Sequence, residues 1–205
     1  MSNLAMVEKM LEKRPNLPKD RVKWELHDGI ITLMSPGTLG HTNVASSIYW
    51  ALKNHLGKGK CKVFMENLIV NLSKDEIFIP DVAVVCDQSI LKEKGAFGAP
   101  DLIVEVLSPS TAQNDRGRKK NVYGSHGVKE YWIVDPKNFA VEVYLLDKGR
   151  LELDAIYTIY PKWQEEDMSE EEKAEKLLYT FSPSIFGDLT VSLHEIFEDV
   201  LPGDY

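Results

Sequence analysis

Apolar and polar residues follow one another along the chain in patterns that predict both strands and helices. Residues 22–26 and 30–34 alternate in polarity on either side of His27-Asp28-Gly29, which predicts a β-hairpin. From His41 to Leu56, apolar residues recur at every third or fourth position, as in a long helix with one buried face. A short amphipathic helix is expected at Asn3–Glu12, and the prolines that follow would end it.

Six further segments have the character of strands, and one more long helix is predicted among them. The helix begins at Ser108-Pro109-Ser110-Thr111 and ends near Gly127, and a last short helix is expected at Leu193–Val200. We find no internal repeat. The expected fold is therefore α/β (α+β), a mixed central β-sheet flanked by helices in a single domain of residues 1–205. The predicted strands are 63–72, 77–86, 101–107, 130–134, 139–146 and 151–160.

Composition and charge narrow the classes of protein that the chain can represent. The chain has 205 residues, 43% of them hydrophobic, and a formal net charge of −8, which excludes a protein whose whole surface binds nucleic acid but permits a local basic groove. No segment is long and apolar enough to predict a membrane span or a signal peptide, so a cytoplasmic location is expected. The acidic run at residues 161–176 predicts a solvated helix or a mobile insertion.

The two cysteines do not have the spacing of a metal site. Cys86 closes an apolar run and is expected to be a buried free thiol in a reducing compartment, although a single disulfide with Cys61 stays open.

Two carboxylates stand where the apolar pattern predicts burial. Asp81 precedes the run VAVV, and Glu105 lies within LIVEVL, which is typical of a strand buried on both faces. An ionised carboxylate in such a strand needs a cation or hydrogen bonds to offset its desolvation. Mg²⁺ prefers oxygen ligands and needs only one or two protein carboxylates, so Asp81, Glu105 and the backbone carbonyl of Val106 form a candidate metal site.

The helix after Glu105 places a lysine beside these acids. One helical face is expected to dock on the sheet, and it would carry Lys119 to the acids, where this residue would position a water or contact a phosphate. The simpler interpretation is an i,i+4 ion pair of Asp115 with Lys119. Lys120 and Arg116 lie on another face and are expected to meet solvent or an anion. The predicted docking face consists of Asp115, Lys119, Val122, Tyr123 and His126.

Together these residues carry a resemblance to a known superfamily. Pro80-Asp81 followed by Glu105 resembles the PD-(D/E)xK motif of the restriction-endonuclease-like nucleases. More specifically, the chain resembles a large bacterial family of uncharacterised endonucleases of the Uma type, long a domain of unknown function. The matching segments are WELHDGIITLMSP, IPDVAVV, PDLIVEVLSPST, GVKEYWIVDP and the D-x3-K-x3-Y of Asp115, Lys119 and Tyr123.

The resemblance implies a restriction-endonuclease-like fold and metal-dependent cleavage of phosphodiester bonds. It assigns metal binding to Asp81 and Glu105 and the lysine role to Lys119. The motif's usual lysine position, two residues after Glu105, holds Leu107, so the resemblance implies that the lysine has moved to the following helix; Lys120 is the alternative. Glu25, His41 and Tyr123 are secondary site candidates. For Glu25 the alternative is a strand-edge glutamate facing water, and for His41 a capping or partly buried histidine.

Local charge allows a nucleic-acid substrate. Five basic residues between Gln113 and Glu130 exceed two acidic ones, and Arg116, Arg118 and Lys120 are the candidate contacts to a phosphate backbone. A homodimer would double this basic surface. The predicted function is that of an Mg²⁺- or Mn²⁺-dependent endonuclease that acts on DNA. The alternatives are an inactive nuclease fold that binds nucleic acid or protein, and a hydrolase of small phosphodiesters.

Overall fold

The computed structural model describes residues 12, 23–34, 37–57 and 59–200. Its centre is a six-stranded mixed sheet in the order β12-β11-β10-β9-β6-β3. In this sheet β9 runs parallel to β10, and the other neighbouring strands are antiparallel. The mixed α+β architecture predicted from the sequence is confirmed. The strands are β3 (Lys62–Met65), β6 (Val82–Val85), β9 (Leu102–Val106), β10 (Glu130–Asp135), β11 (Ala140–Asp147) and β12 (Arg150–Thr158).

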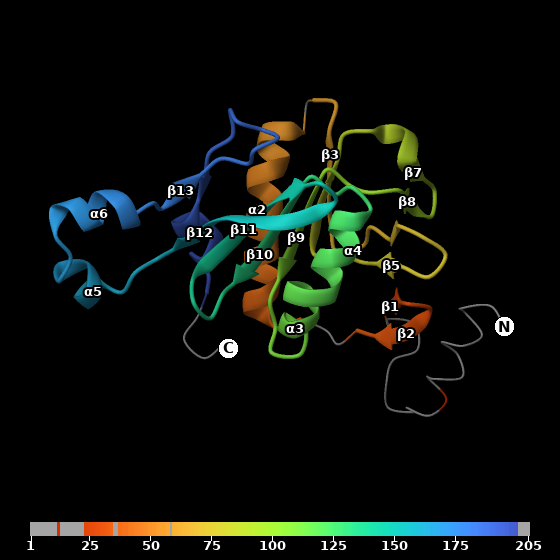
Figure 1. Cartoon of the computed structure of the whole chain (residues 1–205), viewed down its shortest axis with the longest axis horizontal. Helices are drawn as coiled ribbons and strands as arrows, with labels where there is room; N and C mark the ends of the chain where they lie inside the picture. Colours follow the sequence, from red (N-terminus) through yellow and green to blue (C-terminus); the bar gives the residue numbers. More distant parts are fainter. Residues whose placement is uncertain (1–11, 13–22, 35–36, 58, 201–205) are drawn as a thin grey trace.

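Helices cover both faces of this sheet (Figure 1). On one face, α2 (Leu39–Leu56) packs Val44, Ile48 and Leu52 into a core shared with Val82 and Val104. On the other face, the helical stretch after β9 buries Tyr123 against the alternate residues of the strands, Ile103 among them. All five residues of β9 are buried, as a strand covered on both faces requires.

A second six-stranded sheet, in the order β2-β1-β5-β4-β8-β7, lies beside the first (Figure 1). It begins with the predicted hairpin, which is confirmed as β1 (Trp24–His27) and β2 (Ile30–Leu33). Its other strands are two or three residues long: β4 (Val70–Asn71), β5 (Ile77–Phe78), β7 (Leu91–Lys92) and β8 (Gly95–Phe97). A 3₁₀ turn, η1 (Gln88–Ile90), precedes β7.

Two of the predicted strands are each divided between the two sheets. The segment 77–86 forms β5 and β6, because Pro80 between them has no N–H to donate to a ladder. The segment 63–72 forms β3 and β4, and the chain turns at Glu66, which has a positive φ of 53°. The chain between β6 and β9 contains the β7–β8 hairpin. This division places β5 directly before β6 in the chain, and the Ile79 N–H between them donates to Glu25 of β1.

The helix predicted after Ser108 is present but irregular. It consists of α3 (Ala112–Asn114), a π-helical turn η2 (Asp115–Lys119) and α4 (Lys120–Ser125). His126 lies just past the helix and is exposed, so it does not share the buried face predicted for it. A π-turn inside an α-helix is often found at a functional site.

The remaining elements are small. The acidic run folds as α5 (Lys162–Glu166) and α6 (Glu170–Lys176), which project away from the sheets (Figure 1). The two-stranded sheet of β13 (Thr180–Phe181) and β14 (Val191–Ser192) leads into α7 (Leu193–Ile196), which is shorter than the helix predicted there. The helix predicted at Asn3–Glu12 lies, except for Glu12, outside the described residues. No helix among the residues that the structure describes is long and apolar enough to cross a membrane.

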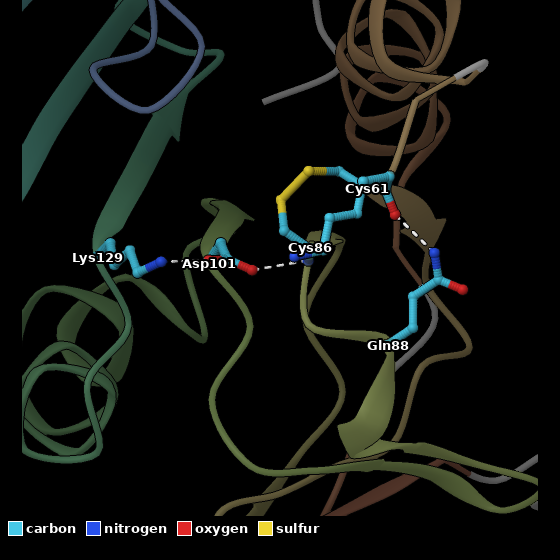
Figure 2. The surroundings of a disulfide bond; sticks show 6 residues. Cys61, Cys86, Gln88, Asp101 and Lys129 are labelled. Carbon is cyan, nitrogen blue, oxygen red and sulfur yellow. Dashed lines mark hydrogen bonds and ion pairs between the residues drawn. A yellow bond between two sulfur atoms is a disulfide. The ribbon is translucent and has the colours of Figure 1, made fainter.

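The prediction of a free thiol at Cys86 is wrong. Cys61 and Cys86 form a disulfide between positions that flank the ends of β3 and β6 (Figure 2). The antiparallel register pairs Lys62 with Val85, so the next two positions stand opposite each other with Cα atoms 3.9 Å apart. The Cys86 N–H also donates to Asp101 Oδ2 at 2.7 Å. The bond therefore ties together two antiparallel strands at the edge of the central sheet.

Candidate active site

Asp81 and Glu105 lie opposite each other on neighbouring strands. Val82 of β6 pairs with Val104 of β9, so the antiparallel register places Asp81, one residue before β6, across from Glu105. The Val106 N–H donates to Asp81 Oδ2 at 2.7 Å, which fixes that carboxylate at the end of the ladder. Glu105 is only 4% exposed. The structure therefore brings together the two acids that the sequence predicts.

His41 contacts Asp81 from the first turn of α2. Its Nε2 lies 3.2 Å from Asp81 Oδ2. Burial lowers the pKa of His41, but the hydrogen bond with Asp81 and the charge of that carboxylate outweigh burial and raise it above its ordinary value. The ring lies against Gly37, where a Cβ would stand 2.9 Å from Nδ1. The close approach of the ring to Gly37 leaves no space there for a larger residue.

Lys119 is the centre of a buried group of charges. Its Nζ lies 2.9 Å from Glu25 Oε1, 3.1 Å from Glu105 Oε1 and 3.7 Å from Asp115 Oδ1. The lysine is 3% exposed. Burial lowers its pKa, but the three carboxylates outweigh burial and hold the pKa of Lys119 above its usual range. The contacts with three carboxylates therefore favour the charged ammonium form of Lys119.

Tyr123 lies one turn beyond Lys119 and contacts the same acid. Its hydroxyl donates to Glu105 Oε1 at 2.9 Å, and its ring is fully buried between Phe78 and Tyr131. Tyr123 thus fixes the orientation of the Glu105 carboxylate from the side of α4.

Glu25 is buried, so the alternative of a strand-edge glutamate facing water is wrong. It is 4% exposed, and the Ile79 N–H donates to its Oε1 at 3.0 Å. His27 Nε2 lies 3.1 Å from its Oε2. Burial raises the pKa of Glu25, but the charge of Lys119 and the hydrogen bonds outweigh burial and lower it to about 2.

The site carries more negative than positive charge. Burial raises the pKa of Glu105 well above its ordinary value and that of Asp115 above its own, and neighbouring carboxylates add to both shifts. An excess of buried carboxylate oxygens suits a hard divalent cation, and one or two carboxylates are enough for Mg²⁺. Among the described residues no group of three or more His, Cys, Asp or Glu is arranged to hold a metal. Two carboxylates, Asp81 and Glu105, still meet the smaller need of Mg²⁺, and a metal held by them together with the Val106 carbonyl stays a prediction.

The candidate nucleic-acid contacts lie on the same helix, and two of them are paired with acids. Arg116, expected to be free for solvent or an anion, instead contacts Glu142 at 2.6 Å and Asp135 at 3.2 Å. Arg118 pairs with Glu76 at 2.6 Å and with Asp28. Lys120 Nζ lies 4.6 Å from the ring centroid of Tyr144. Nothing in this geometry tests whether these residues bind nucleic acid.

Two residues of the site were not selected from the sequence. Asp115 is expected on the docking face as the i,i+4 partner of Lys119; its burial at 2% exposure agrees, and it also belongs to the buried charges around Lys119. His27 lies two residues after Glu25 and therefore on the same face of β1. This spacing in the sequence could have indicated that His27 contacts Glu25.

The lowered pKa of Glu25 gives a testable dependence of stability on pH. Ionised Glu25 stabilises the fold fully above its ordinary pKa of 4.5, and this contribution is lost as the pH falls toward about 2. At pH 7, Glu25→Gln is expected to lower the free energy of unfolding by about 3 kcal/mol. Urea unfolding of both proteins at several pH values should show the difference shrinking below pH 5. A constant difference would contradict the lowered pKa.

Comparison with known proteins gives one family and a set of relatives. The family model Uma2, described as "Putative restriction endonuclease", matches residues 10–174. An uncharacterised protein of Synechocystis is 31% identical over 128 residues, which cover 62% of this chain and 67% of that protein. Another from the same organism is 25% identical over 126 residues, which cover 60% and 71%.

A solved structure has the same fold. The crystal structure of a protein from Anabaena variabilis, described as a putative nuclease belonging to DUF820, aligns with a TM-score of 0.66 and 20% sequence identity. The alignment covers 94% of this chain and 97% of that one. This likeness confirms the restriction-endonuclease-like fold predicted from the sequence.

Proposed function

Because the chain belongs to the Uma2 family, we propose that it is a nuclease that uses Mg²⁺ or Mn²⁺ to hydrolyse phosphodiester bonds in DNA. The observation that carries this proposal is the placement of Asp81 opposite Glu105 at the ends of two buried strands, with the Lys119 ammonium 3.1 Å from Glu105. Buried carboxylates of this kind are costly for a fold, and a purely structural role would be served equally well by apolar residues.

Asp81 and Glu105 are the residues that would hold the metal. A divalent ion bound there would supply Lewis acidity and lower the pKa of a water molecule. Asp81 is kept in place by the Val106 N–H and by His41, and Glu105 by Tyr123. The protein thus orients both carboxylates through backbone and side-chain contacts, as metal ligands require.

Lys119 would act on the phosphate, and His41 on the Asp81 carboxylate. Since three carboxylates hold the Lys119 ammonium in its charged form, it is suited to stabilising negative charge that develops on the phosphate and not to accepting a proton. His41 would act on a metal ligand: its Nε2 lies 3.2 Å from Asp81 Oδ2, and its raised pKa favours the charged form that holds this carboxylate in place.

The proposal is tested by cleavage of supercoiled plasmid at low salt. Wild type with Mg²⁺ or Mn²⁺ is expected to nick the plasmid, and a chelator should abolish nicking. Asp81→Asn, purified identically, is expected to nick about a hundredfold more slowly, because it loses a charged ligand. Calorimetry should show weaker Mn²⁺ binding by the same variant. Equal nicking by both proteins would point to a contaminant and would contradict the proposal.

A second candidate is the hydrolysis of a small phosphodiester. The observation in its favour is that Arg116 and Arg118 are already paired with four carboxylates, which weakens the surface for a long polyanion. Metal-dependent hydrolysis of a chromogenic phosphodiester, without nicking of plasmid or cleavage of RNA, would favour this substrate.

A further inference from the structure

One oxygen of the buried charge group lacks a hydrogen-bond partner within the part of the chain that the structure describes. There Asp115 Oδ1 is buried and accepts no hydrogen bond, and Lys119 Nζ stands 3.7 Å away, beyond hydrogen-bond distance. The same ammonium is within hydrogen-bond distance of Glu25 and Glu105. A buried carboxylate oxygen without a partner is destabilising, so its presence next to a cation calls for an explanation.

The backbone around Asp115 is arranged to aim this side chain inward. The π-helical turn Asp115–Lys119 directs both of its terminal side chains into the interior, where Asp115 is 2% and Lys119 3% exposed. The Tyr131 hydroxyl donates to the Asp115 backbone carbonyl at 3.1 Å and anchors the turn on β10. The Asp115 backbone is therefore anchored on β10, and the lysine side chain is the longer and more adaptable partner of the pair.

We propose that Asp115 is a positioning residue for Lys119, and that its Oδ1 takes over the ammonium when Glu105 binds a divalent cation. This inference rests on the proposed metal site. Glu105 Oε1 accepts from both Lys119 and Tyr123, so a second cation at this carboxylate repels the ammonium. Asp115 offers the nearest free acceptor, and a shift of less than about 1 Å closes the present separation to hydrogen-bond length. Glu25 holds Lys119 in both arrangements.

The inference predicts a role for Asp115 that is neither metal ligation nor simple support of the fold. Without the Asp115 carboxylate, the displaced ammonium lacks its second acceptor, and Mg²⁺ affinity is expected to fall about tenfold although the residue does not touch the metal. Asp115→Glu keeps the charge and is expected to recover part of this affinity. If Asp115 acted only through its charge, the glutamate variant would bind Mg²⁺ as wild type does.

The direct test follows the lysine ammonium by NMR in the full chain labelled with ¹⁵N-lysine. Lys119→Arg identifies the signal. In wild type, Mg²⁺ is expected to shift the Lys119 signal and leave its hydrogens protected from exchange; in Asp115→Asn, Mg²⁺ should expose them and broaden the signal. Asp188→Asn removes an exposed acid that pairs with His55 and serves as the matched control, which should behave as wild type.

Each outcome separates this inference from the proposed function. A wild-type signal that does not respond to Mg²⁺ would overturn the metal site together with the inference. A response that is the same in wild type and Asp115→Asn would overturn the inference alone. The carboxyl ¹³C resonance of Asp115 in wild type answers the question without a substitution, since it should shift with Mg²⁺ when the carboxylate accepts the ammonium; an unchanged resonance beside a shifted Glu105 would contradict the transfer.

Discussion

Replacement of Lys119 by methionine is expected to lower the free energy of unfolding by about 3–5 kcal/mol and to abolish cleavage. Methionine fills a similar volume but leaves Glu25, Glu105 and Asp115 buried without the ammonium that now contacts all three. The loss should be largest near neutral pH. It should diminish as the solution is acidified, because the raised pKa values of Glu105 and Asp115 let these groups become neutral readily.

Chemical unfolding followed by circular dichroism at pH 7 and pH 5 measures this effect. Lys120→Met is the matched control, because Lys120 is the adjacent lysine and contacts the Tyr144 ring instead of a buried acid. We expect the control to lose about 1 kcal/mol or less. Equal losses in the two variants would show that Lys119 does not hold the buried acids together.

Glu105→Gln is expected to reduce cleavage about a thousandfold while leaving stability unchanged or slightly higher. The glutamine keeps the shape and hydrogen-bonding capacity of the side chain but removes the charge proposed to bind the metal. In this variant the Lys119 ammonium still contacts two carboxylates, those of Glu25 and Asp115. Since burial raises the pKa of Glu105, loss of its charge relieves a desolvation cost in the folded state.

Glu130→Gln is the matched control for Glu105→Gln, because it makes the same change at another buried glutamate. Glu130 on the neighbouring strand β10 is fully buried and accepts from Trp132 Nε1 and from the N–H and hydroxyl of Ser184. Glu130→Gln turns an amide donor toward these donors and is expected to cost about 1–3 kcal/mol of stability with cleavage retained. Plasmid nicking and urea unfolding of both variants should therefore show opposite patterns. If Glu105→Gln loses stability and keeps activity, Glu105 is a structural residue.

The sequence predicts the burial of the two central acids well, because the apolar residues around them already indicate buried strands. Glu105 interrupts a run of branched apolar residues, and Asp81 opens another, so both were expected in the interior. Lys119 was found from helical periodicity, and its burial agrees with that prediction. The same periodicity places Asp115 on the docking face, and its burial agrees too, but the sequence gives no sign that Glu25 and Glu105 join the Asp115–Lys119 pair in one buried group of charges.

Other features depend on contacts between distant segments. The disulfide follows from the β3–β6 register, which sets Cys61 across from Cys86 and leaves no trace in their sequence spacing. The ion pairs of Arg116 and Arg118 come from acids 19 to 90 residues away. Pro80 is a local signal in the sequence that the predicted strand 77–86 is divided between two sheets.

The carboxylates that pair with Arg116 and Arg118 compete with any polyanion for these two arginines. A phosphate that approaches Arg116 or Arg118 must displace a carboxylate that is already attached to the same chain and is therefore present at high effective concentration. Four carboxylates of the chain therefore occupy the positions that phosphates of a nucleic acid would take at these arginines. They belong to Asp135 and Glu142 at Arg116, and to Asp28 and Glu76 at Arg118. If the chain binds nucleic acid as proposed, these pairs should weaken binding at the two arginines and leave the proposed metal at Asp81 and Glu105 as the main attachment of the phosphate.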